Sequence, residues 1–312
     1  MKIEIMLRCG GRVICPAVEE GVTWVTERRG VPGVLKFSAA AQELEELKEG
    51  DAVTLYADGK ALFAGFVFKI MRMNSETVQI TAYDQMRYLK NRDSYLFEAM
   101  TASERIRLIA QDFGLQLGRI ADTGHVLPAR VEENAALIDM MLGALDSTLA
   151  ATGRLYHLWD EAGRLTLADA QEMITGVVLD AECGQGYSFE SSIDSESYNR
   201  IKLVYEDEKA GARQVTIAQD ASSMEKWGTL QYFEVLPEDE NAQARAQMLL
   251  SLYNAPDKSL RLSGMAGDVR VHAGCMVVVQ LKEIGANGLM LVEKCRHRFD
   301  HGFHTMELEL HK

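Results

Sequence analysis

Histidine and cysteine side chains gather near the C-terminus in a spacing that could hold a metal ion. Cys295 and His297 are one residue apart, and His301 and His304 follow. Thiolate and imidazole groups are the usual ligands of structural zinc. However, residues 300–302 read Asp-His-Gly, which is typical of a hairpin turn and would point these side chains to different faces. The spacing also matches no zinc finger or ribbon, so we expect ordinary hairpin residues here and no metal.

Two other groups of side chains could support catalysis. Ser223 and Lys226 have the Ser-x-x-Lys spacing of some acyl-transfer enzymes, in which the lysine activates the serine, but the companion Ser-Asp-Asn and Lys-Thr-Gly motifs are absent. Paired carboxylates could act as in a glycosidase. The acidic residues concerned are Asp180, Glu182, Glu206, Asp207 and Glu208. Acidic turns explain them more simply in an acidic chain, so the sequence predicts no enzyme, no catalytic residue and no cofactor.

The composition limits the class of protein. Of 312 residues, 47% are hydrophobic and 25% are charged, which is the balance of globular domains, and two or three domains are expected at this length. The net charge of −13 disfavours specific nucleic-acid binding, which needs clustered Lys and Arg. No apolar run approaches the roughly 18 residues of a membrane helix, so we expect no membrane insertion. Five scattered cysteines without a Cys-x-x-Cys pair indicate reduced thiols.

The spacing of apolar residues predicts the elements that would position these side chains. Alternation over residues 1–95 predicts short strands, with a hairpin turn at Asp58-Gly59. Residues 101–104 (Thr-Ala-Ser-Glu) form a capping box, which predicts that a helix begins there. A second helix is predicted from about Asn134 to Gly153. A β-hairpin should follow, because the period then returns to two.

The two ends of the chain share a pattern. Residues 50–82 and 274–310 both read as a glycine, a strand, a hairpin, a strand ending in lysine and a further strand. The pattern indicates an internal duplication, with a chance alignment of β meanders as the alternative. Three such chains would present six similar units, and a ring of that kind could dock on a six-fold partner.

The expected fold is therefore α+β and mainly β, with two similar small antiparallel β-barrel domains flanking a helical insert that carries a hairpin. The first barrel would occupy residues 1–95 and the insert residues 96–185. The second barrel would occupy residues 186–312, interrupted by a helix near 238–254.

Several stretches in order along nearly the whole chain resemble one family of phage proteins. They are Trp24, residues 30–37 (GVPGVLKF), 49–51 (EGD), 63–65 (FAG), 82–91 (AYDQMRYLKN), 101–104, 112–115 (DFGL), 199–205 (NRIKLVY), 220–231 (DASSMEKWGTLQ), 267–268 (GD), 297–302 (HRFDHG) and 304–306 (HTM). The chain is similar in these stretches to the baseplate hub proteins of contractile phage tails, in the XkdQ-like branch of the late-control gene D group.

The resemblance implies a structural hub that forms a homotrimer with pseudo-six-fold symmetry and joins a hexameric tail tube to a trimeric spike. The expected location is the baseplate of a phage or tailocin, assembled in the bacterial host cytoplasm. The implied partners are the spike protein, tail tube or tube-initiator proteins, the tape-measure protein and a LysM-containing hub neighbour. The resemblance implies no catalytic set. A peptidoglycan-degrading hydrolase, acting through the carboxylates between Asp180 and Glu208, and a carbohydrate-binding β module remain alternatives.

Overall fold

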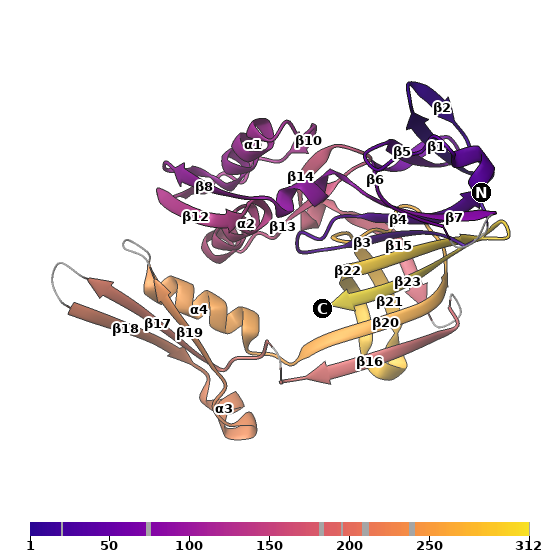
Figure 1. Cartoon of the computed structure of the whole chain (residues 1–312). Coiled ribbons are helices and arrows are strands. Elements are labelled where there is room, and N and C mark those ends of the chain that lie inside the picture. The colour runs from indigo at the N-terminus through magenta and orange to yellow at the C-terminus, as the bar shows by residue number, and fades with distance from the viewer. Residues whose placement is uncertain are drawn as a thin grey trace.

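Alternating apolar strands assemble into one large, mainly antiparallel sheet. The computed structural model describes residues 1–19, 21–72, 76–180, 184–194, 196–207, 212–236 and 241–311. The 13-stranded sheet follows the order β16-β20-β23-β22-β3-β4-β7-β6-β5-β1-β2, and β21 and β15 extend it from β22. Figure 1 shows this sheet on the right, with the helical insert above and to the left of it. Among the described ranges, no helix is long and apolar enough to cross a membrane.

The first part of the chain supplies seven strands of the sheet. They are β1 (Ile3–Cys9), β2 (Arg12–Ile14), β3 (Val22–Glu27), β4 (Val34–Ala40), β5 (Ala52–Ala57), β6 (Lys60–Arg72) and β7 (Thr77–Tyr83), with a short 3₁₀ turn η1 (Ala41–Leu44). Alternate side chains such as Ile5, Leu7 and Ile80 are buried in a shared core. The predicted turn at Asp58-Gly59 is confirmed, because it joins β5 to β6 with φ angles of 47° and 79°.

The helical insert follows. Its elements are η2 (Gln85–Lys90), β8 (Arg92–Phe97), β9 (Met100–Thr101), α1 (Ala102–Asp112), β10 (Leu117–Ile120), β11 (Val126–Leu127), β12 (Arg130–Ala136), α2 (Leu137–Thr152), β13 (Tyr156–Asp160), β14 (Leu165–Asp169) and η3 (Ala170–Glu172). The capping box is confirmed: Thr101 Oγ1 accepts from the Glu104 N–H, and Glu104 Oε2 accepts from the Thr101 N–H at 2.7 Å. The helix predicted from Asn134 begins three residues later, at Leu137, because Asn134 still lies in the β12–β8 ribbon. Gly153 ends that helix in the left-handed conformation, as predicted.

The last part of the chain divides into two layers. The large sheet receives β15 (Ile174–Asp180), β16 (Gly186–Ser192), β20 (Asp257–Ala266), β21 (Met276–Leu281), β22 (Ala286–Asp300) and β23 (Phe303–His311), with η4 (Lys282–Ile284). A separate three-stranded sheet contains β17 (Arg200–Asp207), β18 (Ala212–Gln219) and β19 (Gln231–Leu236), with α3 (Ala221–Trp227) and α4 (Ala242–Tyr253). The predicted helix start at 238 lies outside the described residues, and the described helix is capped by Asn241.

The two β regions are joined edge to edge, which the sequence did not indicate. Strands β22 and β3 pair antiparallel from Lys294 opposite Glu27 to Phe299 opposite Val22. An ion pair joins Lys294 Nζ to Glu27 at 2.9 Å, and a half-buried ion pair joins Arg28 to Glu293 at 2.6 Å. Main-chain pairing and these charges therefore fix one β region against the other.

The strand order of the first β region recurs in the second. The first runs β3-β4-β7-β6-β5-β1 and the second runs β16-β20-β23-β22-β21-β15. If the six strands of each region are numbered in the order in which they follow along the chain, both regions have the same order of numbers across the sheet. One difference is that β1 pairs antiparallel with β5, whereas β15 pairs parallel with β21.

The two regions also agree in local detail. The Gly50 N–H donates to the Val67 carbonyl at 2.8 Å, and the Gly274 N–H donates to the Val292 carbonyl at 2.8 Å. The register of β6 against β7 shifts just after Val67, and that of β22 against β23 shifts just after Val292. A shared bulge at a shared position is a feature that chance alignment of meanders does not produce readily. The expected internal repeat is thus visible in strand order, hydrogen bonds and bulges.

Candidate functional site

The hairpin of β22 and β23 brings together three of the four side chains singled out near the C-terminus. His301 lies at the exposed tip of the hairpin, with a φ of 50°. His304 returns beside His297 because the two strands run antiparallel, so the expectation that their side chains point apart is wrong for this pair. Nδ1 of His297 lies 2.8 Å from Nε2 of His304, and Sγ of Cys295 lies 3.1 Å from Nε2 of His297.

The buried His297 and the half-buried His304 form a hydrogen-bonded chain with fixed proton positions. Nε2 of His297 lies 2.8 Å from the carbonyl oxygen of Val271, which only accepts, so Nε2 carries the proton. Nδ1 of His297 therefore accepts from the Nε2–H of His304. Burial lowers the pKa of His297 to about 3 and that of His304 to about 4, and burial raises the pKa of Cys295. Both ring nitrogens of His297 are engaged, and the described ranges contain no group of three metal-binding side chains.

Ser223 acts as a structural residue at the start of α3. Its N–H donates to Asp220 Oδ1 at 2.7 Å, which caps the helix. Its hydroxyl lies 2.9 Å from the same carboxylate oxygen and 2.7 Å from Asn254 Oδ1. These contacts tie α3 to the end of α4. The Ser223 hydroxyl is thus held by the Asp220 carboxylate and the Asn254 side-chain amide, and within the described residues no hydrogen bond joins it to Lys226.

The carboxylates considered for a glycosidase lie in different sheets. Asp180 ends β15, opposite Gln280 of β21 in the large sheet. Glu206 and Asp207 lie at the end of β17 in the three-stranded sheet, at the far left of Figure 1. Glu182 and Glu208 lie outside the described residues. The structure therefore does not bring the described members of this group together as a catalytic pair.

A cavity of about 250 Å³ lies where the insert meets both β regions, and the sequence did not reveal it. Its lining includes Asp84 after β7, His157 and Asp160 of β13, and His272 before β21. Nε2 of His157 and Oδ2 of Asp160 have no hydrogen-bond partner in the described part of the chain. These residues come from three segments far apart in the sequence, so no spacing rule could have grouped them.

Burial raises the pKa of two carboxyl groups in this cavity, those of Asp84 and Asp160. Asp84 Oδ2 accepts from the Gly33 N–H at 2.7 Å, and its Oδ1 accepts from the Met86 N–H at 3.0 Å. Burial raises the pKa of Asp160 to about 6, and burial, followed by the charge of Asp160, raises that of Asp84. Because both oxygens of Asp84 hold backbone N–H groups, its arrangement suits positioning of the β3–β4 loop better than proton transfer to a substrate.

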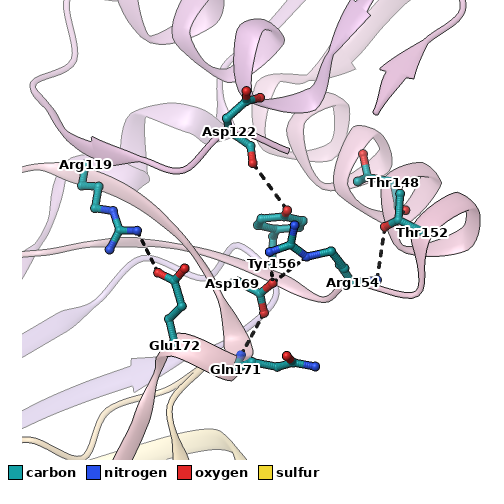
Figure 2. A network of polar contacts seen from close by, with 9 residues as sticks. All are labelled: Arg119, Asp122, Thr148, Thr152, Arg154, Tyr156, Asp169, Gln171 and Glu172. Atoms are coloured by element: carbon teal, nitrogen blue, oxygen red, sulfur yellow. Dashed lines mark hydrogen bonds and ion pairs between the residues drawn. The ribbon is translucent and has the colours of Figure 1, made fainter. Parts of the chain in front are cut away.

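A polar network anchors the hairpin of the insert to α2 (Figure 2). Asp169 is buried, accepts from Arg154 Nε at 2.9 Å and accepts from the Gln171 N–H at 2.9 Å. The Arg154 guanidinium also lies 5.4 Å from the centre of the Tyr156 ring. In contrast, the Arg119–Glu172 ion pair in Figure 2 is exposed on both sides.

Replacement of Asp169 by alanine is therefore expected to destabilise the insert by about 1–3 kcal/mol, because a helix cap and a charge-assisted hydrogen bond are lost. The matched control is Glu172→Gln, which removes an exposed pair and should cost less than about 0.5 kcal/mol. Urea unfolding of both variants measures the difference. Equal losses would show that the buried carboxylate contributes nothing beyond a surface charge.

The three-stranded sheet exposes an apolar face. One face packs on α4 through Ile201 and Leu203. Its opposite face carries four exposed apolar side chains, namely Val215, Ile217, Phe233 and Val235. Lys202 lies over the Phe233 ring at 5.9 Å. Clustered apolar side chains on an exposed sheet face are typical of a surface that contacts another protein.

The comparisons with known proteins agree on one family. The YqbQ-like family model matches residues 22–311. The phage-like element PBSX protein XkdQ of Bacillus subtilis is 31% identical over 293 residues, which cover 90% of this chain and 87% of that protein. The match thus extends across both β regions and the insert.

Solved structures share the fold at low sequence identity. A tail protein from Neisseria meningitidis matches with a TM-score of 0.72 at 15% identity, covering 100% of this chain and 97% of that one. The 43 kDa tail protein of prophage MuSo2 from Shewanella oneidensis matches with a TM-score of 0.70 at 15% identity, covering 98% and 97%. The complete arrangement of sheet, insert and three-stranded layer is therefore an architecture found in tail proteins.

Proposed function

Because this chain belongs to the YqbQ-like family, we propose that it is a structural hub protein in the baseplate of a contractile phage tail or tailocin. Three copies form a ring with pseudo-six-fold symmetry, which joins a hexameric tail tube to a trimeric spike. In this proposal each β region is a small antiparallel barrel, and the chain divides at residues 1–95, 96–185 and 186–312. The particle is assembled in the bacterial host cytoplasm.

The repeated strand order is the observation that supports this proposal most directly. A trimer of chains with one unit each can match only a three-fold partner. A chain with two similar units places six units around a three-fold axis, so one face of the ring fits a six-fold tube while the other fits a trimeric spike. The shared bulge and the shared glycine contacts make the two units similar at the level of main-chain geometry.

The proposed partners follow from this place in the particle. They are the spike protein, tail tube or tube-initiator proteins, the tape-measure protein and a LysM-containing hub neighbour. The exposed apolar face of β17, β18 and β19 offers one surface for such a contact. The proposed role is one of binding through surfaces, without an active site. The hydrolase alternative is weakened because Asp180 and the Glu206–Asp207 pair lie in different sheets.

The mass of the purified chain in solution tests the proposal. Light scattering, with the chain alone and with the spike protein encoded beside it, is expected to give a trimer or a three-to-three complex. A persistent monomer in both samples would contradict the hub function. Digestion of peptidoglycan by the chain, lost on Asp180→Asn but kept on Glu172→Gln, would support the hydrolase instead.

A further inference from the structure

The joint between the two β regions within one chain suggests how neighbouring chains join. We infer that the free edge of β6, at residues 69–72, pairs antiparallel with the free edge of β16 (Gly186–Ser192) in a second copy of this chain. The inference rests on the proposed ring of three chains. Beyond that ring, the two open edges specify which strands of neighbouring copies pair, in which direction and in which register.

The template is the pairing of β22 with β3. The first half of β22 pairs with β21, and the register ends at Leu291. Its second half extends past β21 and pairs with β3 from Lys294 to Phe299. Strand β22 of the second repeat thus extends beyond the end of its hairpin partner β21, and there it pairs with β3 of the first repeat.

The first repeat has the equivalent long strand, but within the described ranges its extension has no strand partner on that side. Strand β6 pairs with β5 from Lys60 to Phe66, and its residues 69–72 pair only with β7 in the described part of the chain. These residues correspond to 294–297 of β22, because Val67 and Val292 share the bulge and the glycine contact. The edge that β3 occupies on β22 is therefore open on β6.

The complementary open edge belongs to β16. This strand is the counterpart of β3, and within the described residues it pairs only with β20, at the end of the sheet. Figure 1 shows it along the lower border of the sheet. An unpaired strand edge is a ready template for main-chain pairing with another chain. Strands β6 and β16 are separated by six strands in the sheet order, so one chain presents its two open edges at separate places.

The equivalences between the repeats give the register. In the first repeat, Trp24 lies opposite Leu35, and Leu35 lies opposite Ala82. In the second repeat, Phe189 lies opposite Leu260 in the same way, and Leu260 lies opposite Leu310. Phe189 is therefore the counterpart of Trp24. Since His297 lies opposite Trp24, its counterpart Arg72 lies opposite Phe189 of the next copy, and Met71 lies opposite Glu190.

The side chains at this register are compatible in charge. Lys69 corresponds to Lys294, which forms an ion pair across the internal joint. If β6 pairs with β16 of the next copy as β22 pairs with β3, Lys69 lies opposite Ser192 and diagonal to Glu190. Diagonal neighbours on paired strands are within reach of long side chains. The contact is head to tail, because it pairs two different edges, and three such contacts close a ring.

Paired cysteines test the register. Met71→Cys with Glu190→Cys places two thiols directly opposite each other, where antiparallel Cα atoms lie about 4.5–5.5 Å apart and a disulfide forms without strain. The matched control is Met71→Cys with Ser188→Cys, one diagonal step away at roughly 7–8 Å and outside disulfide range. Both variants carry Cys15→Ser, because Cys15 is an exposed thiol, and Cys183→Ser, because Cys183 lies outside the described residues. Each is oxidised alone and with the spike protein, and its mass is measured in parallel.

We expect the opposed pair to give a covalent trimer on a non-reducing gel, at least about tenfold above the control pair. Mixing the two single-cysteine chains, Met71→Cys and Glu190→Cys, should give covalent dimers, whereas neither chain alone should. A trimer by light scattering without this disulfide would overturn the joint and leave the hub function standing. A monomer under all conditions would overturn both. If the cysteine variants fold poorly, Lys69→Glu should dissociate the trimer and Lys69→Glu with Glu190→Lys should restore it, and no restoration would refute the register.

Discussion

Replacement of Gly274 by alanine is expected to lower the free energy of unfolding by at least about 3 kcal/mol. A Cβ at this position would lie 1.9 Å from Cδ2 of His157, and the backbone has a φ of +87°, which disfavours any side chain. His157 cannot withdraw easily, because it is buried and stacks on Trp159 with ring centres 5.4 Å apart. The substitution should therefore force the insert away from the second β region. Denaturant unfolding with a tertiary-structure probe measures the loss.

The internal repeat supplies a matched control for this prediction. Gly50 has a φ of +92° and donates to Val67 as Gly274 donates to Val292, but a Cβ at Gly50 meets nothing within 4 Å. Gly50→Ala should therefore cost only the backbone strain, about 1–2 kcal/mol. The difference between the two variants isolates the contact with His157. Equal losses would show that the insert does not press on the second β region at this point.

Local features were predicted from the sequence because a few adjacent residues determine them. The turn at Asp58-Gly59 requires positive φ angles, and the capping box of Thr101 and Glu104 is complete within four residues. The sequence pattern places the start of α2 three residues too early, at Asn134, whereas cross-strand pairing with β8 keeps this residue in a strand. Tertiary pairing there overrides the local pattern.

The joints between the parts of the chain could not be predicted in this way. The β22–β3 pairing unites Val22 with Phe299, and nothing in either segment specifies the other. The approach of Asp160 to Asp84 likewise depends on how the insert folds back onto the first β region. The open edges of β6 and β16 also depend on which strands pair across the whole sheet. Interfaces depend on such long-range pairing, whereas the repeat itself left a trace in the sequence.

Acid is expected to weaken the contribution of His297 to stability by about 3 kcal/mol between pH 7 and pH 4. The ordinary pKa of 6.5 is lowered by burial to about 3 in the folded chain. The unfolded chain therefore binds a proton between pH 6.5 and 3 that the folded chain does not. The stabilisation is complete above pH 6.5 and is lost as the pH falls towards 3. Protonation would also place a second N–H on Nδ1, against the donating Nε2–H of His304.

The comparison of the native chain with His297→Gln isolates this effect from other titrating groups. Asp160 titrates in the opposite sense, because its raised pKa of about 6 makes the folded chain retain a proton that the unfolded chain has lost. The free energy of unfolding of the native chain therefore contains both trends. The difference in this free energy between the native chain and His297→Gln cancels the contribution of Asp160. Unfolding free energies measured at pH 7 and pH 4 should show the native advantage shrinking by about 3 kcal/mol. A constant difference across this range would mean that His297 takes up its proton as readily in the folded chain as in the unfolded one, contrary to the hydrogen bonds that fix its neutral form.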